Sequence, residues 1–216
     1  GLAGRYKVLY LPAMLTLRKE LLPLLKKYVE EGGRLVMDLP SGWYDENTVN
    51  LPTGKGSDFE QLFGTTIDDF QFSGTNRQLI VAGKEVQGFT MNSTATAARV
   101  VEKYDNGKPA VLEHTLGKGK AILLGFQASL NAFETSAKAS SSLLQYTLGT
   151  YSSPYTCPNA LVYRLAAPEA DHYFLLNEAT AKTVALTFKN LNYKRVTDVI
   201  TGEAVNINQL KLTTKG

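Results

Sequence analysis

The spacing of hydrophobic residues near the start of the chain predicts a strand, a helix and a second strand. Residues 6–11 are apolar except for Lys7, which is typical of a parallel strand covered on both faces. After residue 16, apolar side chains recur at steps of three and four, and charged side chains fill the positions between them. Such a pattern gives a helix with one side on a sheet and the other in water. Residues 34–39 are again mostly apolar, so we expect a βαβ unit with two parallel strands and a right-handed crossover.

The ends of this helix are also marked in the sequence. Thr16 is the expected N-cap, because its hydroxyl can accept a hydrogen bond from a backbone N–H of the first turn. The helix then starts near Leu17. Pro23 would bend the helix or cost it a hydrogen bond, unless the helix begins later, at Leu22. The pair Gly32–Gly33 supplies the left-handed residue that ends the helix.

Beyond residue 46 the pattern changes to a polar loop followed by short strands. Asp58 is the expected cap of a short helix that Gly64 ends. The turn Asp105–Lys108 contains Asn-Gly and predicts a β-hairpin. Most strands of this region are expected to be antiparallel or to lie at sheet edges. The expected strands cover residues 65–72, 77–83, 85–92, 98–105, 109–117 and 121–126, and a helix is expected over residues 129–148.

A second change of character follows Ser152–Pro154, where short strands and turns replace the α/β pattern. We therefore expect an α/β domain over residues 1–152 and a small antiparallel β domain over residues 153–216. A module of about 60 residues buries little surface, so we expect it to pack against another part of the protein. Its expected strands cover residues 160–167, 172–179, 182–190, 193–205 and 209–216.

Composition narrows the classes of function. The 216 residues are 44% hydrophobic and 20% charged with a net charge of +3, as in ordinary globular proteins. Lysines and arginines alternate with acids, so we expect no nucleic-acid partner. No apolar stretch reaches the roughly 20 residues that a membrane helix needs, so we expect no membrane partner either. The compartment stays open between bacterial cytoplasm, periplasm and secretion.

Candidate nucleophiles are few. Cys157 is the only cysteine and lies in a linker-like segment before a proline, which favours a free thiol over an amidotransferase nucleophile. Ser41 follows the second strand, but its surroundings do not match the G-x-S-x-G elbow. A Ser41–His114–Asp38 triad is conceivable, because such triads have arisen on many folds. The positions of His114 in an alternating strand and of His172 at the head of a strand favour hydrogen-bonded surface histidines over catalytic ones.

Acid pairs and glycine-lysine segments also have simple structural explanations. A glycosidase needs two carboxyls about 5 to 9 Å apart, whereas the pairs Asp45–Glu46 and Asp68–Asp69 are adjacent in sequence and are expected in loops. Two distant histidines and one cysteine show no metal-ligand spacing, so no metal is expected. Lys118–Lys120 fits a hairpin turn better than a phosphate loop, so no cofactor is expected.

The most informative non-catalytic residue is Trp43, the only tryptophan, which stands beside Tyr44. Open α/β sheets place ligand sites after the carboxyl ends of parallel strands, and this is where the pair falls. Together with Asp45 and Asn47, the two aromatic residues form a loop that could stack on a sugar or dock against another subunit. A tryptophan that simply covers the sheet edge is the alternative.

A series of short motifs occurs in a fixed order along the first part of the chain: Tyr6–Lys7, Pro12–Met14, Tyr28–Glu30, Gly32–Gly33, Ser41–Gly42 and Asp45–Asn47. This order resembles the β-galactosidase trimerisation domain of family 42 glycoside hydrolases, a degenerate relative of class I glutamine amidotransferase domains. Residues 107–125 resemble its late strands, and residues 193–203 are similar to the small β domain that closes many such glycosidases.

The resemblance implies a flavodoxin-like or amidotransferase-like, partly parallel sheet flanked by helices, followed by a small antiparallel β-sandwich domain. It also implies a domain that forms trimers and lies near the active-site cleft of a neighbour. In the family, a catalytic (β/α)8 barrel precedes these domains, and a barrel of about 250 residues does not fit here. The family domain begins with one more strand and helix, so we expect a C-terminal fragment that lacks its first βα unit.

Three functional hypotheses follow. The first is a non-catalytic accessory region of a β-galactosidase-like glycoside hydrolase, inactive by itself, whose partners are its own upstream catalytic domain or further copies in a homo-oligomer. The second is a carbohydrate-binding module that uses Trp43 and Tyr44. The third is a small serine hydrolase that uses Ser41.

Overall fold

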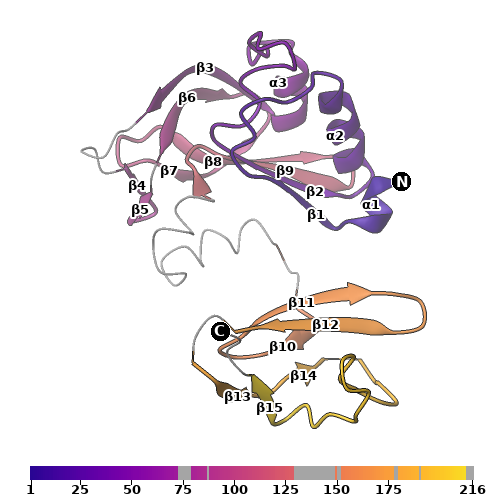
Figure 1. Ribbon diagram of the computed structural model, residues 1–216. Coiled ribbons are helices and arrows are strands. Elements are labelled where there is room, and N and C mark those ends of the chain that lie inside the picture. Colours follow the sequence, from indigo (N-terminus) through magenta and orange to yellow (C-terminus); the bar gives the residue numbers. More distant parts are fainter. Residues whose placement is uncertain are drawn as a thin grey trace. The chain divides into compact units, whose positions relative to one another are not determined.

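The structure is a computed structural model that describes residues 1–72, 79–86, 88–128, 149, 152–177, 180–189 and 191–212. The chain forms two compact units, Gly1–Gly149 and Thr150–Gly216 (Figure 1). The helix expected over residues 129–148 lies outside the described residues.

A mixed sheet of five strands organises the first unit, in the order β1-β2-β9-β8-β7. The strands β1, β2 and β9 run parallel, while β8 and β7 continue the sheet antiparallel. The predicted βαβ unit is confirmed, and so is the α/β class. The predicted hairpin at residues 105–108 joins β7 to β8. The strands are β1 (Val8–Leu11), β2 (Arg34–Asp38), β7 (Arg99–Lys103), β8 (Pro109–Leu116) and β9 (Gly119–Leu124).

Helix α2 (Leu21–Glu30) connects β1 to β2 but begins later than Thr16 would place it. The expected N-cap at Thr16 is wrong: the N-cap is Glu20, and Thr16 instead forms a parallel β-bridge with Tyr44. Because Pro23 is the third residue of the helix, it lies where backbone N–H groups have no intrahelical partner and costs no hydrogen bond. Gly32 has a φ of 111° and ends the helix as expected.

Helix α3 (Asp58–Phe63) ends at Gly64, which has left-handed backbone angles, as the sequence predicts. Its cap is Ser57 and not Asp58: the Ser57 hydroxyl accepts a hydrogen bond from the Glu60 N–H at 3.1 Å. The capping residue is the one with extended backbone angles just before the helix, and Ser57 has them. A short helix α1 (Leu2–Arg5) precedes β1.

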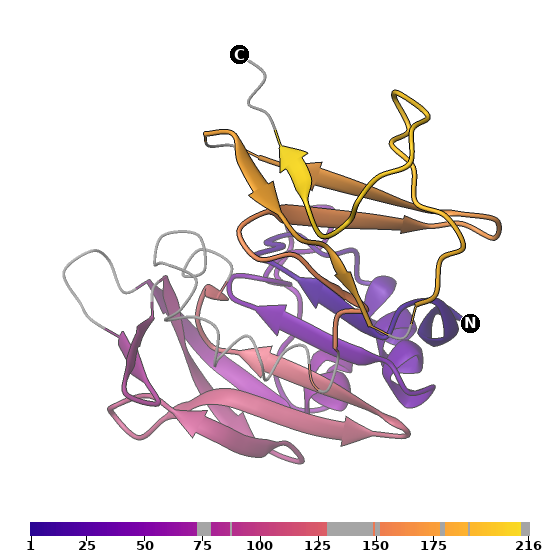
Figure 2. The same ribbon diagram turned by 90° about the horizontal axis from the view of Figure 1, so that it is seen from below.

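The core of the first unit lies on both faces of the sheet. Helices α2 and α3 cover one face (Figures 1 and 2), where Leu35, Met37 and Leu123 are fully buried among helix residues. On the other face, Val81 and Val86 pack with Ile122. These two valines belong to the hairpin of β4 (Leu79–Val81) and β5 (Lys84–Val86).

A two-stranded antiparallel ribbon of β3 (Thr65–Phe72) and β6 (Phe89–Ala95) completes the first unit. The single strand expected over residues 85–92 is wrong: β5 and β6 are separate strands with Gly88, at a φ of 93°, between them. The ribbon brings Phe70, Phe72 and Phe89 to one side, because Phe72 lies directly opposite Phe89 and successive side chains alternate.

Within its described residues, the second unit contains three two-stranded antiparallel sheets. An aromatic cluster connects two of them, because Tyr173 on β12 packs against Tyr155 on β10 and Phe188 on β14. The sheets pair β10 (Tyr155–Thr156) with β14 (Thr187–Phe188), β11 (Leu161–Ala166) with β12 (Asp171–Leu176), and β13 (Lys182–Val184) with β15 (Leu210–Leu212).

The strand expected over residues 193–205 is wrong. The described residues 193–205 contain no strand, and in this segment Thr197 and Ala204 form an isolated antiparallel β-bridge. Between them, one carboxylate oxygen of Asp198 accepts the N–H groups of Ile200 and Thr201 at 2.7 and 3.1 Å. An aspartate that bonds the backbone two and three residues on favours a turn over an extended strand.

Candidate interaction surface

The Trp43 loop lies directly after β2 and is bonded to the loop that follows β1. The Gly42 N–H donates to the Met14 carbonyl at 2.9 Å, and the Trp43 N–H donates to the Leu15 carbonyl at 3.1 Å. The Leu51 N–H returns to the Trp43 carbonyl at 2.9 Å. The two loops therefore form one hydrogen-bonded edge at the carboxyl ends of two parallel strands.

The indole ring of Trp43 packs into the aromatic side of the β3–β6 ribbon. Its centroid lies 4.3 Å from that of Phe70 at an interplanar angle of 36°, and 4.8 Å from that of Phe89 in an edge-to-face contact. Phe89 in turn contacts Phe72 at 5.1 Å. The Trp43 Nε1 is buried and has no hydrogen-bond partner among the described residues. Trp43 is half-buried and contacts two phenylalanine rings, so it anchors its loop on the ribbon.

Exposed apolar side chains lie on the segments that are bonded to Trp43 or contact it through the ribbon. Met14 and Leu15 are 39% and 43% exposed, Val49 is 60% exposed and Phe72 is 70% exposed. We call these four residues, together with the packed rings of Trp43, Phe70 and Phe89, the Trp43 patch. The sequence pointed to Trp43, but it did not point to Met14, Leu15 or Phe72, because the fold brings them together from three separate segments.

The polar residues of the loop act on the loop itself. Asp45 is buried, and its Oδ1 accepts the Asn47 N–H at 2.8 Å and the Val49 N–H at 2.9 Å. Thr48 has a φ of 63°, which this tight turn requires. Tyr44 is half-buried, while Asn47 is exposed at the tip. The Asp45 carboxylate therefore shapes the turn.

Ser41 and Asp38 hold the loop after β1. The buried Ser41 hydroxyl donates to the Leu11 carbonyl at 3.1 Å and accepts the Met14 N–H at 2.9 Å. The Asp38 carboxylate accepts the Tyr10 hydroxyl at 2.7 Å and the Ala13 N–H at 2.5 Å. Both side chains thus bond groups of β1 and its loop.

The structure does not bring His114 to Ser41. His114 on β8 lies opposite Ala121 of β9, and Ala121 lies opposite Leu35 of β2. His114 is therefore two strands away from β2. Along the strand direction it is level with Leu35, which comes six residues before Ser41. Two strand spacings alone are roughly 10 Å. The Nδ1 of His114 instead lies 3.0 Å from the Leu62 carbonyl oxygen. No triad forms from Ser41, His114 and Asp38.

The other sequence candidates lie in other segments of the chain. Asp68 and Asp69 belong to strand β3 and not to a loop, because the ribbon extends through them with a bulge. Cys157 is half-buried in the second unit, and burial raises the pKa of its thiol. Lys118 lies in the turn between β8 and β9, where its N–H donates to the Glu30 carbonyl. The described ranges contain no group of three potential metal ligands and no helix able to cross a membrane.

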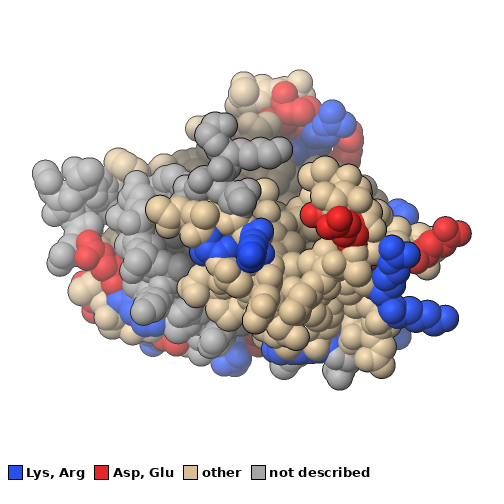
Figure 3. All heavy atoms as spheres, turned by 60° about the horizontal axis from the view of Figure 1, so that its bottom comes forward, with Lys and Arg blue, Asp and Glu red and all other residues tan. Residues whose placement is uncertain are grey.

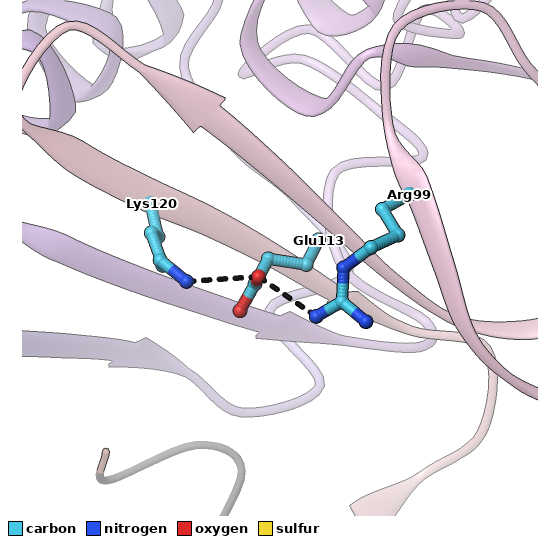
Figure 4. A network of polar contacts seen from close by, with 3 residues as sticks. All are labelled: Arg99, Glu113 and Lys120. Carbon is cyan, nitrogen blue, oxygen red and sulfur yellow. Dashed lines mark hydrogen bonds and ion pairs between the residues drawn. The ribbon is translucent and has the colours of Figure 1, made fainter. Parts of the chain in front are cut away.

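A cluster of ion pairs lies on strands β7, β8 and β9. Glu113 receives hydrogen bonds from Arg99 at 3.0 Å and Lys120 at 2.9 Å, both on Oε1 (Figure 4). Burial raises the pKa of Glu113, but the bonds from Lys120 and Arg99 outweigh it and hold the pKa below its usual value. On the face shown in Figure 3, lysine and arginine side chains lie in small groups separated by uncharged surface.

The comparison with known families decides the classification. Residues 3–143 match the family described as the β-galactosidase trimerisation domain. The chain belongs to this family. The resemblance predicted from the motifs between Tyr6 and Asn47 is thereby confirmed.

Several proteins to which this trimerisation-domain chain is similar are β-galactosidases. The LacZ β-galactosidase of Heyndrickxia coagulans is 28% identical over 131 residues, which are 57% of this chain and 20% of that protein. Gan42B, a GH42 β-galactosidase from G. stearothermophilus, is 25% identical with a TM-score of 0.72 over 98% of this chain and 31% of its own. The β-galactosidase of Bacillus circulans sp. alkalophilus shares the fold, with a TM-score of 0.73 at 16% identity over 99% of this chain and 32% of its own.

The chain thus spans about a fifth of the curated relative and under a third of these solved enzymes. The 216 residues comprise the trimerisation domain and a small β unit, and the catalytic barrel is absent from them.

Proposed function

We propose that this chain is the oligomerisation and support region of a β-galactosidase-like glycoside hydrolase and is inactive by itself. The observation that carries the proposal is the family match over residues 3–143, combined with an apolar Trp43 patch at the sheet edge where catalytic groups would be expected. The β-galactosidase activity belongs to the parent enzyme, with the barrel as its site.

The chemistry of the described residues supports this assignment. Glycoside hydrolysis uses one carboxyl as acid and a second as base or nucleophile. Near the patch, Asp38 and Asp45 accept backbone or tyrosine hydrogen bonds and shape their own loops. The serine hydrolase hypothesis is also not supported. The Ser41 hydroxyl is bonded to two backbone groups, and His114, the base of the expected triad, is bonded to the Leu62 carbonyl instead of to Ser41.

We also infer a flavodoxin-like, amidotransferase-like ancestry for the first domain, which we place at residues 1–152. The parallel strands β1, β2 and β9, with α2 as crossover, support it. In the segment after β2, Pro40–Gly42 stands where an active amidotransferase would carry its cysteine, which fits a domain without that activity. Cys157, the only cysteine, lies in the second unit.

We place the second domain at residues 153–216 and interpret it as a small β-sandwich. The packing of Tyr173 against Tyr155 and Phe188 supports two layers, because these rings come from different sheets. A hydrogen-bonded pair of hydroxyls, Tyr173 and Tyr193 at 2.7 Å, adds a polar link within the same cluster.

Light scattering of the 216-residue chain across a range of concentrations tests the proposal. We expect the mass of three chains at high concentration and no hydrolysis of a nitrophenyl galactoside. A chain that stays monomeric throughout would contradict the oligomerisation role, and galactoside turnover by the purified chain would contradict its inactivity.

Carbohydrate binding is the second candidate, and the exposed ring of Phe72 beside the Trp43 cluster favours it. Titration with galactose and galactosides, followed through the fluorescence of Trp43, tests this alternative. A saturable change in emission would support a sugar site, and an unchanged spectrum would count against it.

A further inference from the structure

We infer that the Trp43 patch is the surface through which one copy of this chain contacts a second copy. The inference rests on the proposed oligomerisation function and assigns it to named residues. In this assignment the patch does more than cover the sheet edge, because a second copy of the chain packs against it.

Exposure is the first step of the argument. Val49 and Phe72 keep more than half of their surface open although both are apolar, and Met14 and Leu15 add two further exposed side chains. Single exposed apolar residues are ordinary, whereas a group of them around one anchor marks an interaction site. Tryptophan, phenylalanine and methionine are also the types that interfaces favour.

Rigidity is the second step. The patch residues from the two loops are fixed by backbone bonds between Met14 and Gly42, and between Leu15 and Trp43, and the Ser41 hydroxyl adds a third link to Met14. Phe72 is held by its contact with Phe89. A surface that is ordered before binding loses less conformational entropy on association, so its apolar area is used more effectively.

The chemistry of the patch is the third step, and it favours a protein over a sugar. Sugar sites need several polar groups that fix the hydroxyls of the ligand. Here the polar groups nearest the patch are engaged internally: Ser41 with Leu11 and Met14, and Asp45 with Asn47 and Val49. Asn47 is the exposed polar tip of the loop, while Met14, Leu15, Val49 and Phe72 are exposed and apolar, which suits burial against another apolar surface.

The family identifies the partner as a second copy, because its description is that of a trimerisation domain. A closed ring of three copies uses head-to-tail contacts, so the Trp43 patch of each copy meets a different surface of the next. Each of the three contacts then contains one patch. A substitution in the patch therefore weakens every contact of the ring at once.

The experiment compares two double variants of the full chain. The patch variant is Val49→Thr with Phe72→Ser, both at exposed side chains, so the fold is retained. The matched control is Val199→Thr with Ile200→Ser, which removes two apolar side chains that are 81% and 90% exposed in the second unit. Light scattering gives the mass of each variant against concentration. Circular dichroism and urea unfolding check that both variants are folded.

We expect the patch variant to need at least about tenfold higher concentration than the wild type to assemble, since central interface residues carry most of the binding energy. The control should assemble like the wild type. The emission of Trp43, the only tryptophan, should also shift when the wild-type assembly is diluted apart.

The outcomes separate this inference from the function on which it rests. If the wild type forms trimers that the patch variant forms equally well, and if dilution leaves the Trp43 emission unchanged, the patch is not the contact surface and the oligomerisation role stands. If the wild type is monomeric at every concentration, the oligomerisation role itself is overturned. Equal weakening in both double variants would show a general effect of lost apolar surface and would also overturn the assignment.

Discussion

The Ser41 hydroxyl joins the end of β1 to the loop beyond it, donating to the Leu11 carbonyl at 3.1 Å while it accepts the Met14 N–H at 2.9 Å. A residue that follows β2 thus fixes the segment that follows β1. The same hydroxyl looks like a candidate nucleophile in the sequence, but both of its hydrogen bonds are structural.

Replacement of Ser41 by alanine should therefore lower the free energy of unfolding by about 1–3 kcal/mol, because two backbone groups lose their partner. Urea unfolding of the chain measures the change. Ser152→Ala, at an exposed serine, is the control and should stay within about 0.5 kcal/mol of the wild type. Equal stability of the two variants would contradict the role of the hydroxyl.

Gly119 allows the end of α2 to approach β9. A Cβ at this position would lie 2.2 Å from the carbonyl oxygens of Gly33 and Val29, which are backbone atoms and cannot move aside. We expect Gly119→Ala to destabilise the chain by about 3 kcal/mol or more, as severe overpacking does. Thermal and urea unfolding measure the loss. Gly54→Ala is the control, since no atom lies within 4 Å of its Cβ, and a comparable loss there would refute the steric explanation.

The pH dependence of stability should reveal the ion pairs of Glu113. Its pKa in the folded chain is lowered below the unfolded value, which is about 4.3. A lowered carboxyl pKa stabilises the fold above the unfolded pKa, and this contribution is lost as the pH falls through the folded pKa. Wild-type chain should therefore be more stable than Glu113→Gln at pH 7, and the difference should shrink at acid pH.

Urea midpoints of both proteins at several pH values test this expectation. Glu203→Gln, at an exposed glutamate, is the matched control. A difference between wild type and Glu113→Gln that stays constant down to the lowest pH would show that the charge of Glu113 does not contribute.

Cys157 should react slowly with thiol reagents in the folded chain. Burial raises the pKa of its thiol, and the positive charge of Lys182 opposes this effect only in part, so little thiolate is present near neutral pH. We expect slower reaction with Ellman's reagent than for free cysteine, and faster reaction once urea unfolds the chain. Equal rates in the folded and unfolded chain would be inconsistent with this view. Cys157→Ser should abolish the signal, because the chain has no other cysteine.

Local patterns in the sequence predicted the elements whose causes are local. The β1–α2–β2 unit follows from apolar spacing and from the Gly32 stop, and the β7–β8 hairpin follows from its Asn-Gly turn. The N-cap at Asp58 was wrong because Ser57, one residue earlier, has the extended backbone angles of a cap. The N-cap at Thr16 was wrong because Thr16 pairs with Tyr44 and the helix begins only at Leu21.

The Trp43 patch could not be predicted from local sequence patterns. Trp43 itself is noticeable in the sequence because it is unique and follows a strand. Its neighbours come from the loop after β1 and from the β3–β6 ribbon, and the register that places Phe72 opposite Phe89 is set by pairing between distant segments. The spacing of apolar residues within one segment does not predict which residues of another segment it will pair with.

The position of β9 has a consequence for the order of folding. β9 forms a tight hairpin with β8, yet its other neighbour, β2, lies roughly 85 residues earlier in the chain. The hairpin can form in about 1–10 μs, whereas the parallel pairing must close a long loop first. We therefore expect the β8–β9 hairpin to form before β9 pairs with β2, so that the sheet of the first unit closes across its parallel strands late in folding.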